Sequence, residues 1–238
     1  MSFFSVASLV ICGIGLPVFL ALLCLLEEIY AIISMPFVSQ MYNLQILCAL
    51  HLNYSIRKTR NKMKHEGKPQ VVWRAPPLHW IKVNSDGLSK GNPGPAAYGA
   101  VYRSSEGDFI GCFAMKIGCN TSFFAELSAA IHAIEIAYQR GWRMLWIESD
   151  SIAVLQCLQN NKFCCPWLLR NKWLYCLDYM KSMTLGFSHI YMKGNCIADR
   201  LTNIGLGFNS FTWWDSAPTQ ISSLLVRDAC GLPNYWFK

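Results

Sequence analysis

A run of short strand patterns, followed by alternating helix and strand patterns, constrains the fold of this chain most. Apolar and polar residues alternate over 80–86, 98–103 and 109–117, with turns rich in Gly, Pro and Ser between them. Strands joined by such short turns form an antiparallel meander. The remaining patterns predict helices over 124–140, 151–159, 166–180 and 196–204, and strands over 143–149 and 185–192. This order predicts an α/β domain with a five-stranded mixed sheet flanked by helices, in which the later strands run parallel to the first.

The composition agrees with one globular domain plus an appendage. The chain has 238 residues, of which 53% are hydrophobic and 15% are charged, so it can bury a core without disulfide staples. Its 11 Cys residues are an odd number, and no two of them have the C-x-x-C spacing of a metal site. We therefore expect reduced thiols and an intracellular protein, in the nucleus or the cytoplasm.

The positive charge is distributed unevenly along the chain. The formal net charge is +7, yet residues 1–56 contain no Lys or Arg and only two acids, Glu27 and Glu28. The polar stretch that follows contains a run of basic residues: Arg57, Lys58, Arg60, Lys62, Lys64 and Lys68. A cationic second part of the chain favours a polyanionic partner such as nucleic acid.

The hydrophobic N-terminal segment is a second anomaly. Residues 2–26 carry no charged side chain and are long enough to span a bilayer, although Gly13, Gly15 and Pro17 weaken a helix there. Two interpretations stay open: a single membrane-anchoring helix, or a relic of a larger parent protein. We divide the chain into a hydrophobic segment (1–36), a linker with the basic run (37–72), a folded domain (73–205) and a C-terminal extension (206–238).

Four acids stand at positions where this topology brings side chains together. Asp86 ends the first strand and Asp150 ends the fourth, and both strands are expected to be central in the sheet. Glu126 and Asp199 fall in the first turns of two helices. Because crowded carboxylates repel one another, the strand-end pair favours hard divalent cations with oxygen ligands. The helix macrodipole would explain Glu126 and Asp199 separately, but it does not explain the strand-end pair.

The same acids lie in motifs that resemble a known family. The motifs are Asp86-Gly87 followed by Gly91-Asn92-Pro93-Gly94, then Ala125-Glu126-Leu127, Glu148-Ser149-Asp150-Ser151, and Asn195-x-x-Ala198-Asp199-x-Leu201. In this order they resemble the ribonuclease H type 1 family, and more narrowly the ribonuclease H-like domains of plant non-LTR retroelement reverse transcriptases. The resemblance covers about residues 73–205. It implies the ribonuclease H-like fold, which agrees with the order of elements above.

The resemblance also implies an activity and a set of site residues. The four acids would hold two Mg²⁺ or Mn²⁺ ions and so cut the RNA strand of an RNA-DNA hybrid. Asp86 would bridge both ions, Glu126 and Asp150 would complete one shell, and Asp199 would anchor the ion that positions the water. Asn92 would contact the RNA sugar, where a 2′-hydroxyl distinguishes RNA from DNA. The other positions in substrate-binding motifs are Gly87, Ser122, Ser151 and Asn195.

Departures from the family pattern keep a second function open. The Gly-His loop that precedes the last Asp in bacterial and animal members is missing, and we interpret His189, on a strand, as structural. Ser122 stands where Asn is common, and Ile152 stands where a polar residue is common. Both departures imply weaker hybrid binding. The alternative to an enzyme is therefore a catalytically weak or inactive nucleic-acid-binding module of retroelement origin, and we expect a monomer.

Overall fold

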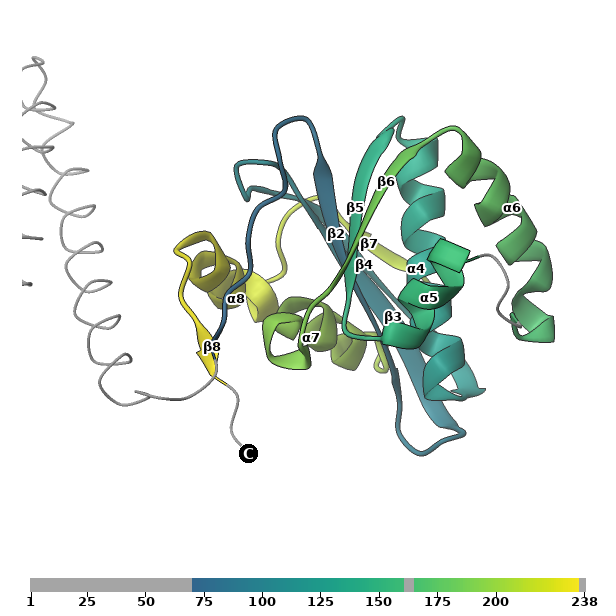
Figure 1. The fold of residues 1–238 in the computed structure, drawn as a ribbon. Coiled ribbons are helices and arrows are strands. Elements are labelled where there is room, and N and C mark those ends of the chain that lie inside the picture. The colour runs from purple at the N-terminus through teal and green to yellow at the C-terminus, as the bar shows by residue number, and fades with distance from the viewer. Residues whose placement is uncertain (1–69, 161–164, 236–238) are drawn as a thin grey trace, which may run out of the picture. The chain divides into compact units, whose positions relative to one another are not determined.

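The computed structural model describes residues 70–160 and 165–235, so the hydrophobic segment and the basic run lie outside the described residues. The main sheet has six strands in the order β6-β5-β2-β3-β4-β7 (Figure 1). Their bounds are Ile81–Ser89 (β2), Gly94–Arg103 (β3), Phe109–Asn120 (β4), Met144–Ser149 (β5), Thr184–His189 (β6) and Thr212–Trp214 (β7). Two short strands, β1 (Gln70–Val71) and β8 (Asn234–Tyr235), pair with each other.

The sheet is mixed, as the sequence predicts. Strands β2, β3 and β4 form the antiparallel meander, while β5 pairs parallel with the other side of β2 and β6 pairs parallel with β5. The sheet has one strand more than predicted, because β7 pairs antiparallel with residues 112–114 of β4. With three residues, β7 is too short to show a strand period in the sequence.

Two strand ends differ from the prediction. β2 does not end at Asp86, because its pairing with β3 continues to Ser89. Its parallel pairing with β5 stops earlier, at the pair Ser85 and Ser149. β6 ends at His189 rather than at residue 192, since the 3-10 helix η2 (Met192–Gly194) follows. Asp86 therefore lies inside an antiparallel strand, at the level where its parallel neighbour ends.

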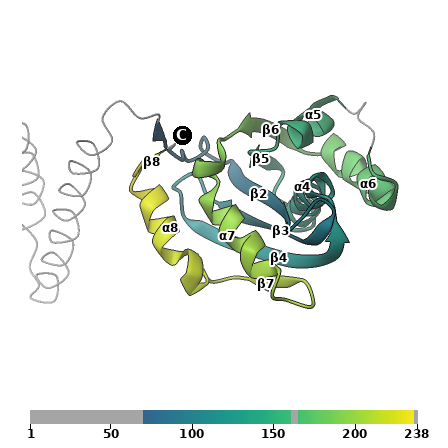
Figure 2. The ribbon, with the colours of Figure 1, turned by 90° about the horizontal axis from the view of Figure 1, so that it is seen from below.

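Helices cover both faces of the sheet (Figure 2). On one face, α4 crosses β2, β3 and β5, with α5 and α6 beside it; on the other face, α7 lies over β2, β3 and β4 and contacts α8. Their bounds are Ser122–Gln139 (α4), Ile152–Asn160 (α5), Arg170–Lys181 (α6), Cys196–Gly205 (α7) and Thr219–Ala229 (α8), with the 3-10 helix η1 (Trp167–Leu169) before α6. The helices predicted from apolar spacing are thus confirmed, and α8 is additional.

Two apolar clusters occupy the two faces of the sheet. The larger cluster lies between the sheet and α4, and it includes Val83, Leu127, Ile134, Leu145 and Ile147. The smaller cluster lies under α7 and α8 and consists of Val101, Cys112, Ile197, Leu201 and Ile221. Burying an aliphatic side chain of this size contributes about 1.5–3 kcal/mol. The two clusters therefore pack helices against both faces of the sheet and fix the strands that carry the site described below.

Residues 206–235 contribute to the same fold. They form β7 at the edge of the main sheet, α8 against α7, and β8 beside β1. Ile221 of α8 is fully buried in the smaller cluster. The predicted C-terminal extension therefore contributes an apolar side chain to the core of the domain. Within the described parts of the chain, no helix combines the length and the hydrophobicity that crossing a membrane requires.

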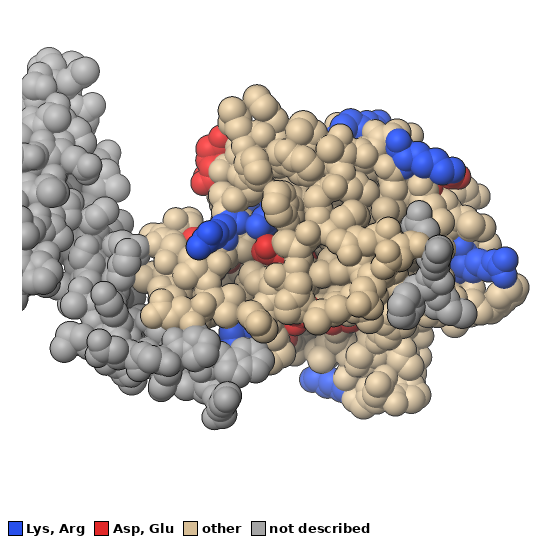
Figure 3. Space-filling view, in the orientation of Figure 1, with Lys and Arg blue, Asp and Glu red and all other residues tan. Residues whose placement is uncertain are grey.

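The basic charge is not concentrated on the described domain. Acidic and basic side chains are nearly balanced among the described residues. On the face shown in Figure 3, Lys and Arg side chains are scattered rather than gathered in one patch. Most of the net positive charge belongs to the basic run within 57–68, outside the described residues. The electrostatic argument for a polyanionic partner therefore depends on that run more than on the folded surface.

Candidate active site

Three of the four predicted acids meet at the carboxyl end of β5. Asp86 and Asp150 directly follow the last parallel pair, Ser85 and Ser149, so they leave neighbouring strands at the same level. Glu126 reaches them from α4. One carboxylate oxygen of each acid lies within 4.8 Å of the others. This is the juxtaposition that the sequence predicts for the strand-end pair, with Glu126 added to it.

Gly87 allows Glu126 to come this close. A Cβ atom at position 87 would lie 2.1 Å from the backbone nitrogen of Glu126 and 2.3 Å from the carbonyl carbon of Ala125, so β2 and α4 touch backbone to backbone. Glu126 is not in the first helical turn as predicted, because α4 begins at Ser122 with Thr121 as its N-cap. The macrodipole acts mainly within the first turn, so it does not account for this acid.

Asp199 is the fourth acid, and it lies at the rim of the site. It is exposed, in the first turn of α7. The sheet holds α7 at close range, since a Cβ atom on Gly99 of β3 would lie 3.1 Å from the Cβ of Leu201. The charge of Asp199 acts on both Asp86 and Asp150, so it faces the same site, although it stands outside the group of three carboxylates.

Burial and mutual repulsion disfavour the charged forms of these acids. Burial, followed by the charges of Asp150 and Asp199, raises the pKa of Asp86 to about 7. Burial, followed by the charges of Asp86 and Asp150, raises the pKa of Glu126 well above its usual range. Burial also raises the pKa of Asp150. In addition, the Oε2 atom of Glu126 is buried and has no hydrogen-bond partner among the described residues. Among the described residues, no cation therefore neutralises Asp86 or Glu126.

This donor set fits a divalent cation. Hard cations such as Mg²⁺ and Mn²⁺ prefer carboxylate oxygens. A cation would give the buried Oε2 atom of Glu126 a partner, and it would offset both the burial and the like charges that raise the pKa of Asp86 and Glu126. The residues placed to hold an ion are Asp86, Glu126 and Asp150, with Asp199 at the rim.

Two of the predicted substrate positions touch each other. The Oδ1 atom of Asn92, in the turn between β2 and β3, accepts a hydrogen bond from the backbone N–H of Ser122 at 3.1 Å. Ser122 is the first residue of α4, the helix that carries Glu126. Ser151 is half-buried and directly follows Asp150. Ser122 thus precedes Glu126 by about one helical turn, Ser151 adjoins Asp150, and Asn92 is hydrogen-bonded to Ser122.

Asn195 differs from the other predicted substrate positions because it is buried. Its Nδ2 atom donates to the backbone oxygen of Ser85 at 2.9 Å and to Oδ1 of Asp150 at 3.3 Å. Its Oδ1 atom accepts from Nδ2 of Asn84 at 3.3 Å. The Asn195 amide therefore orients the Asp150 carboxylate through a hydrogen bond. It is buried and so is not exposed for contact with a substrate.

His189, interpreted from the sequence as a structural histidine, is not part of the buried core. The side chain is exposed at the end of β6, and its ring meets Tyr191 edge-on, with 5.3 Å between the ring centroids. Burial raises the pKa of Asp150, whereas hydrogen bonds and the charge of His189 lower it. His189 is therefore a solvent-accessible group that acts electrostatically on one of the acids.

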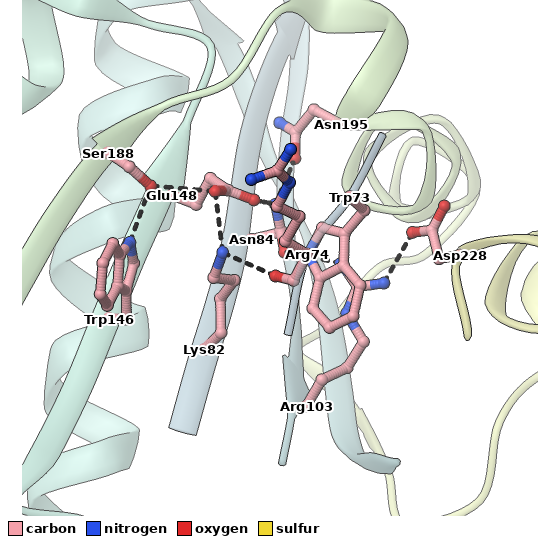
Figure 4. A network of polar contacts seen from close by, with 10 residues as sticks. All are labelled: Trp73, Arg74, Lys82, Asn84, Arg103, Trp146, Glu148, Ser188, Asn195 and Asp228. Atoms are coloured by element: carbon pink, nitrogen blue, oxygen red, sulfur yellow. Dashed lines mark hydrogen bonds and ion pairs between the residues drawn. The ribbon is translucent and has the colours of Figure 1, made fainter. Parts of the chain in front are cut away.

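A buried polar network behind the acids was not predicted from the sequence (Figure 4). Glu148 is its centre. The Oε1 atom of Glu148 pairs with Nζ of Lys82 at 3.0 Å and accepts from Ser188 at 2.9 Å, while its Oε2 atom accepts from Nδ2 of Asn84 at 2.9 Å. The sequence does contain one sign of this network: every second residue of β2 is polar, and these residues share one face of the strand. They are Lys82, Asn84 and Asp86.

Two relatives are similar to the chain in sequence. A protein of Arabidopsis thaliana named "Putative ribonuclease H protein" is 32% identical over 169 residues, which are 68% of this chain and 26% of that protein. Ribonuclease HI of Halobacterium salinarum is 41% identical over 66 residues, which are 28% of this chain and 33% of that protein. The chain thus spans about a quarter to a third of the length of these relatives.

The fold has a solved counterpart. The N-terminal RNase H domain of a Mycobacterium tuberculosis protein, solved as a fusion with maltose-binding protein, is 24% identical, with a TM-score of 0.50 over 54% of this chain and 94% of that chain. Residues 84–205, just over half of the chain, match the reverse transcriptase-like family. This stretch contains all four acids. The chain therefore belongs to the reverse transcriptase-like family, and its described domain has the RNase H-like fold.

Proposed function

We propose that the domain is an endonuclease that hydrolyses the RNA strand of RNA-DNA hybrids with the help of two Mg²⁺ or Mn²⁺ ions. The observation that carries this proposal is the group formed by Asp86, Glu126 and Asp150, whose oxygens lie within 4.8 Å of one another. The repulsion within it and the unpartnered Oε2 atom of Glu126 favour a cation there. Two relatives that bear ribonuclease H names support the same reaction class.

Each acid has a proposed role that its place supports. Asp86 lies on β2, and the charges of both Asp150 and Asp199 act on it, so it would bridge the two ions. Glu126 and Asp150 would complete the shell of one ion, and Asp199 would anchor the ion nearer to solvent. When bound, the ions would lower the pKa of a water and neutralise the negative charge that develops on the phosphate.

The remaining residues of the site would orient the acids and the substrate. Asn195 holds Asp150 by a hydrogen bond at 3.3 Å, and Gly87 lets Glu126 approach β2. On the open side, Asn92 and Ser122 form a polar edge where a ribose can bind. A 2′-hydroxyl is both a donor and an acceptor. Such an edge would therefore favour RNA over DNA in the strand that is cut.

The test is cleavage of a labelled RNA-DNA hybrid by the purified chain, 1–238, in Mg²⁺ or Mn²⁺. We expect cuts in the RNA strand that leave 3′-hydroxyl and 5′-phosphate ends, with no cleavage of duplex DNA and none in EDTA. Asp86→Asn should abolish cleavage without unfolding the protein, because an amide keeps the shape and loses the charge. Asp178→Asn is the matched control, since Asp178 forms an exposed ion pair on α6. Intact, folded protein that binds the hybrid and does not cut it would refute the enzyme proposal.

A further inference from the structure

A continuous series of polar contacts joins α8 to Asp150, and Figure 4 shows it as far as Asn195. The Oδ2 atom of Asp228 pairs with Nη1 of Arg103 at 2.6 Å. The Nη2 atom of Arg103 donates to Oδ1 of Asn84 at 2.7 Å. Asn84 donates to Asn195 at 3.3 Å, and Asn195 donates to Asp150 at 3.3 Å. A residue of the last helix is thus connected to a candidate metal ligand through side chains alone.

The members of this series are shielded from water. Arg103, Asn84 and Asn195 are each 1% exposed, and Asp228 is 8% exposed. Trp73 covers the Arg103 guanidinium, which lies 3.5 Å from the centroid of the indole ring. A buried guanidinium without a counter-ion is costly, so Asp228 is needed to keep Arg103 in this position. Interactions in such a low-dielectric setting are strong and directional.

Arg103 also fixes which way the Asn84 amide points. The Oδ1 atom of Asn84 accepts from two donors, Nη2 of Arg103 at 2.7 Å and Nε1 of Trp73 at 2.9 Å. Neither donor can act as an acceptor, so the NH₂ group of Asn84 must face Glu148 and Asn195. Because the NH₂ group of Asn84 needs an acceptor, the side-chain oxygen of Asn195 must face it. The NH₂ group of Asn195 is then directed at Asp150. Arg103 therefore sets the donor direction at Asp150 together with Trp73, which also donates to Asn84, and with the backbone oxygen of Ser85, which accepts from Asn195.

We propose that Arg103 and Asp228 are positioning residues for Asp150, and that residues 206–235 complete the candidate site. The inference rests on the proposed function, and it goes beyond the family match, because Trp73 and Asp228 lie outside residues 84–205. Loss of Arg103 leaves Trp73 as the donor to the Asn84 oxygen, so the Asn84 amide is held less firmly and becomes free to reverse. The reversed amide would turn the oxygen of Asn195 toward the carboxylate of Asp150, where two acceptors repel each other.

The experiment compares variants that separate positioning from stability, all in the full chain. Asp228→Asn leaves a buried charge unpaired and should lower the melting temperature. Arg103→Met with Asp228→Leu removes both charges, which is often neutral or stabilising, yet it removes the donor to Asn84. We expect this double variant to melt close to the wild type, to cut the hybrid at least tenfold more slowly, and to need several-fold more Mg²⁺ for half-maximal rate. Ile221→Ala is the control: it loosens the apolar packing of α8 and should leave the Mg²⁺ requirement unchanged at temperatures below its melting point.

A second readout does not depend on cleavage. With ¹⁵N-labelled Asn, the side-chain NH₂ signals of Asn84 and Asn195 can be followed by NMR in metal-free protein, with Asn195→Ser to assign one of them. Positioning by Arg103 predicts that both signals shift in the double variant and stay in place in Ile221→Ala. If the wild type cuts nothing but the signals shift as expected, the proposed function fails and the positioning role stands. Unchanged signals, or a folded double variant with the wild-type rate and Mg²⁺ requirement, would overturn the positioning role.

Discussion

The side-chain oxygen of Asn92 accepts a hydrogen bond from the backbone N–H of Ser122 at 3.1 Å, which ties the β2-β3 turn to the start of α4. The turn and the helix therefore present one polar edge beside Glu126 rather than two independent loops. With its oxygen occupied, Asn92 keeps its NH₂ group for a partner on the open side. Ile152, which is 56% exposed at the start of α5, lies directly after Asp150 and Ser151 in the chain.

Adding polar groups at Ser122 and Ile152 should strengthen hybrid binding. The two positions lie at the beginnings of α4 and α5, beside the acids, and each recovered hydrogen bond is worth about 1 kcal/mol. We expect Ser122→Asn combined with Ile152→Gln to lower KM for the hybrid several-fold with little change in kcat. Leu174→Gln on α6 adds a polar group at another exposed apolar position and should change neither constant. An unchanged or higher KM in the double variant would show that these positions do not contact the substrate.

Asp86→Asn should make the metal-free protein more stable at high pH. The folded pKa of Asp86, about 7, exceeds the unfolded value of about 3.9, so the folded state holds the proton more tightly. The stability that this gives is fully present below about pH 4 and is lost as pH rises through 7. In EDTA, the free energy of unfolding of the variant minus that of the wild type should grow by roughly 1–4 kcal/mol between pH 4 and pH 8.

Thermal melts across this pH range provide the measurement. Mg²⁺ at pH 8 should raise the melting temperature of the wild type, because the ion relieves the repulsion at Asp86, and it should affect the variant much less. Asp178→Asn, on the exposed face of α6, serves as the control for removing a carboxylate away from the site. A difference between Asp86→Asn and wild type that stays constant with pH would mean that the raised pKa of Asp86 is incorrect.

Gly87→Ala should impair both folding and cleavage. The added methyl group would lie 2.1 Å from the backbone of Glu126, so α4 must move away from β2. We expect a loss of about 1–3 kcal/mol in the free energy of unfolding and a loss of cleavage of at least tenfold, since Glu126 moves with its helix. In the control Gly207→Ala, the methyl group meets only the backbone oxygen of Ile204, at 3.4 Å. Wild-type cleavage by Gly87→Ala would show that the backbone contact does not set the site.

The four acids could be placed from the sequence because they follow recognisable elements. Strand alternation ending near Asp86 and Asp150 predicts their approach, and apolar spacing predicts the helix that carries Glu126. The boundary errors have physical causes: β2 continues past Asp86 because β3 still pairs with it, and α4 begins earlier because Thr121 caps it. The spacing of apolar residues along the chain reveals neither how far β3 pairs with β2 nor how well Thr121 caps α4.

The network around Arg103 could not be predicted in the same way. Arg103 and Asp228 are separated by 125 positions in the chain, and a lone charge at a strand end is usually solvated. Its burial depends on Trp73 and α8, which come from opposite ends of the described domain. A tertiary contact of this kind has no local signal, whereas the alternating polar residues of β2 did indicate a polar face.

The N-terminal segment 2–26 is predicted to govern location and to contribute nothing to the fold of the domain. Its composition has no charged side chain, and the described sheet has helices on both faces without it. Carbonate extraction of a fluorescent fusion of the full chain, compared with a fusion that begins at Tyr54, decides between the two interpretations: retention of the full chain alone in the membrane pellet indicates a membrane helix. Both proteins should cut the hybrid equally. Release of both fusions would leave the relic interpretation.

The basic run is predicted to supply most of the salt-dependent affinity for nucleic acid. The described surface has nearly balanced charges, whereas the run contains six Lys and Arg residues within 57–68. Cations that neutralise phosphates release counterions, so affinity falls with salt in proportion to their number. A chain that begins at Gln70 should bind the hybrid more weakly than one that begins at Tyr54, with a shallower salt dependence. Equal slopes would place the phosphate contacts on the folded domain instead.

The pairing of β1 with β8 sets Gln70 opposite Tyr235, so the chain enters and leaves the described domain at adjacent points. Folded units whose ends adjoin can be inserted into a longer polypeptide without distortion. Any flanking chain is therefore connected to the domain through the pair of strands β1 and β8. A mechanical pull on the flanking chain would load that two-residue ladder before it reaches the six-stranded sheet.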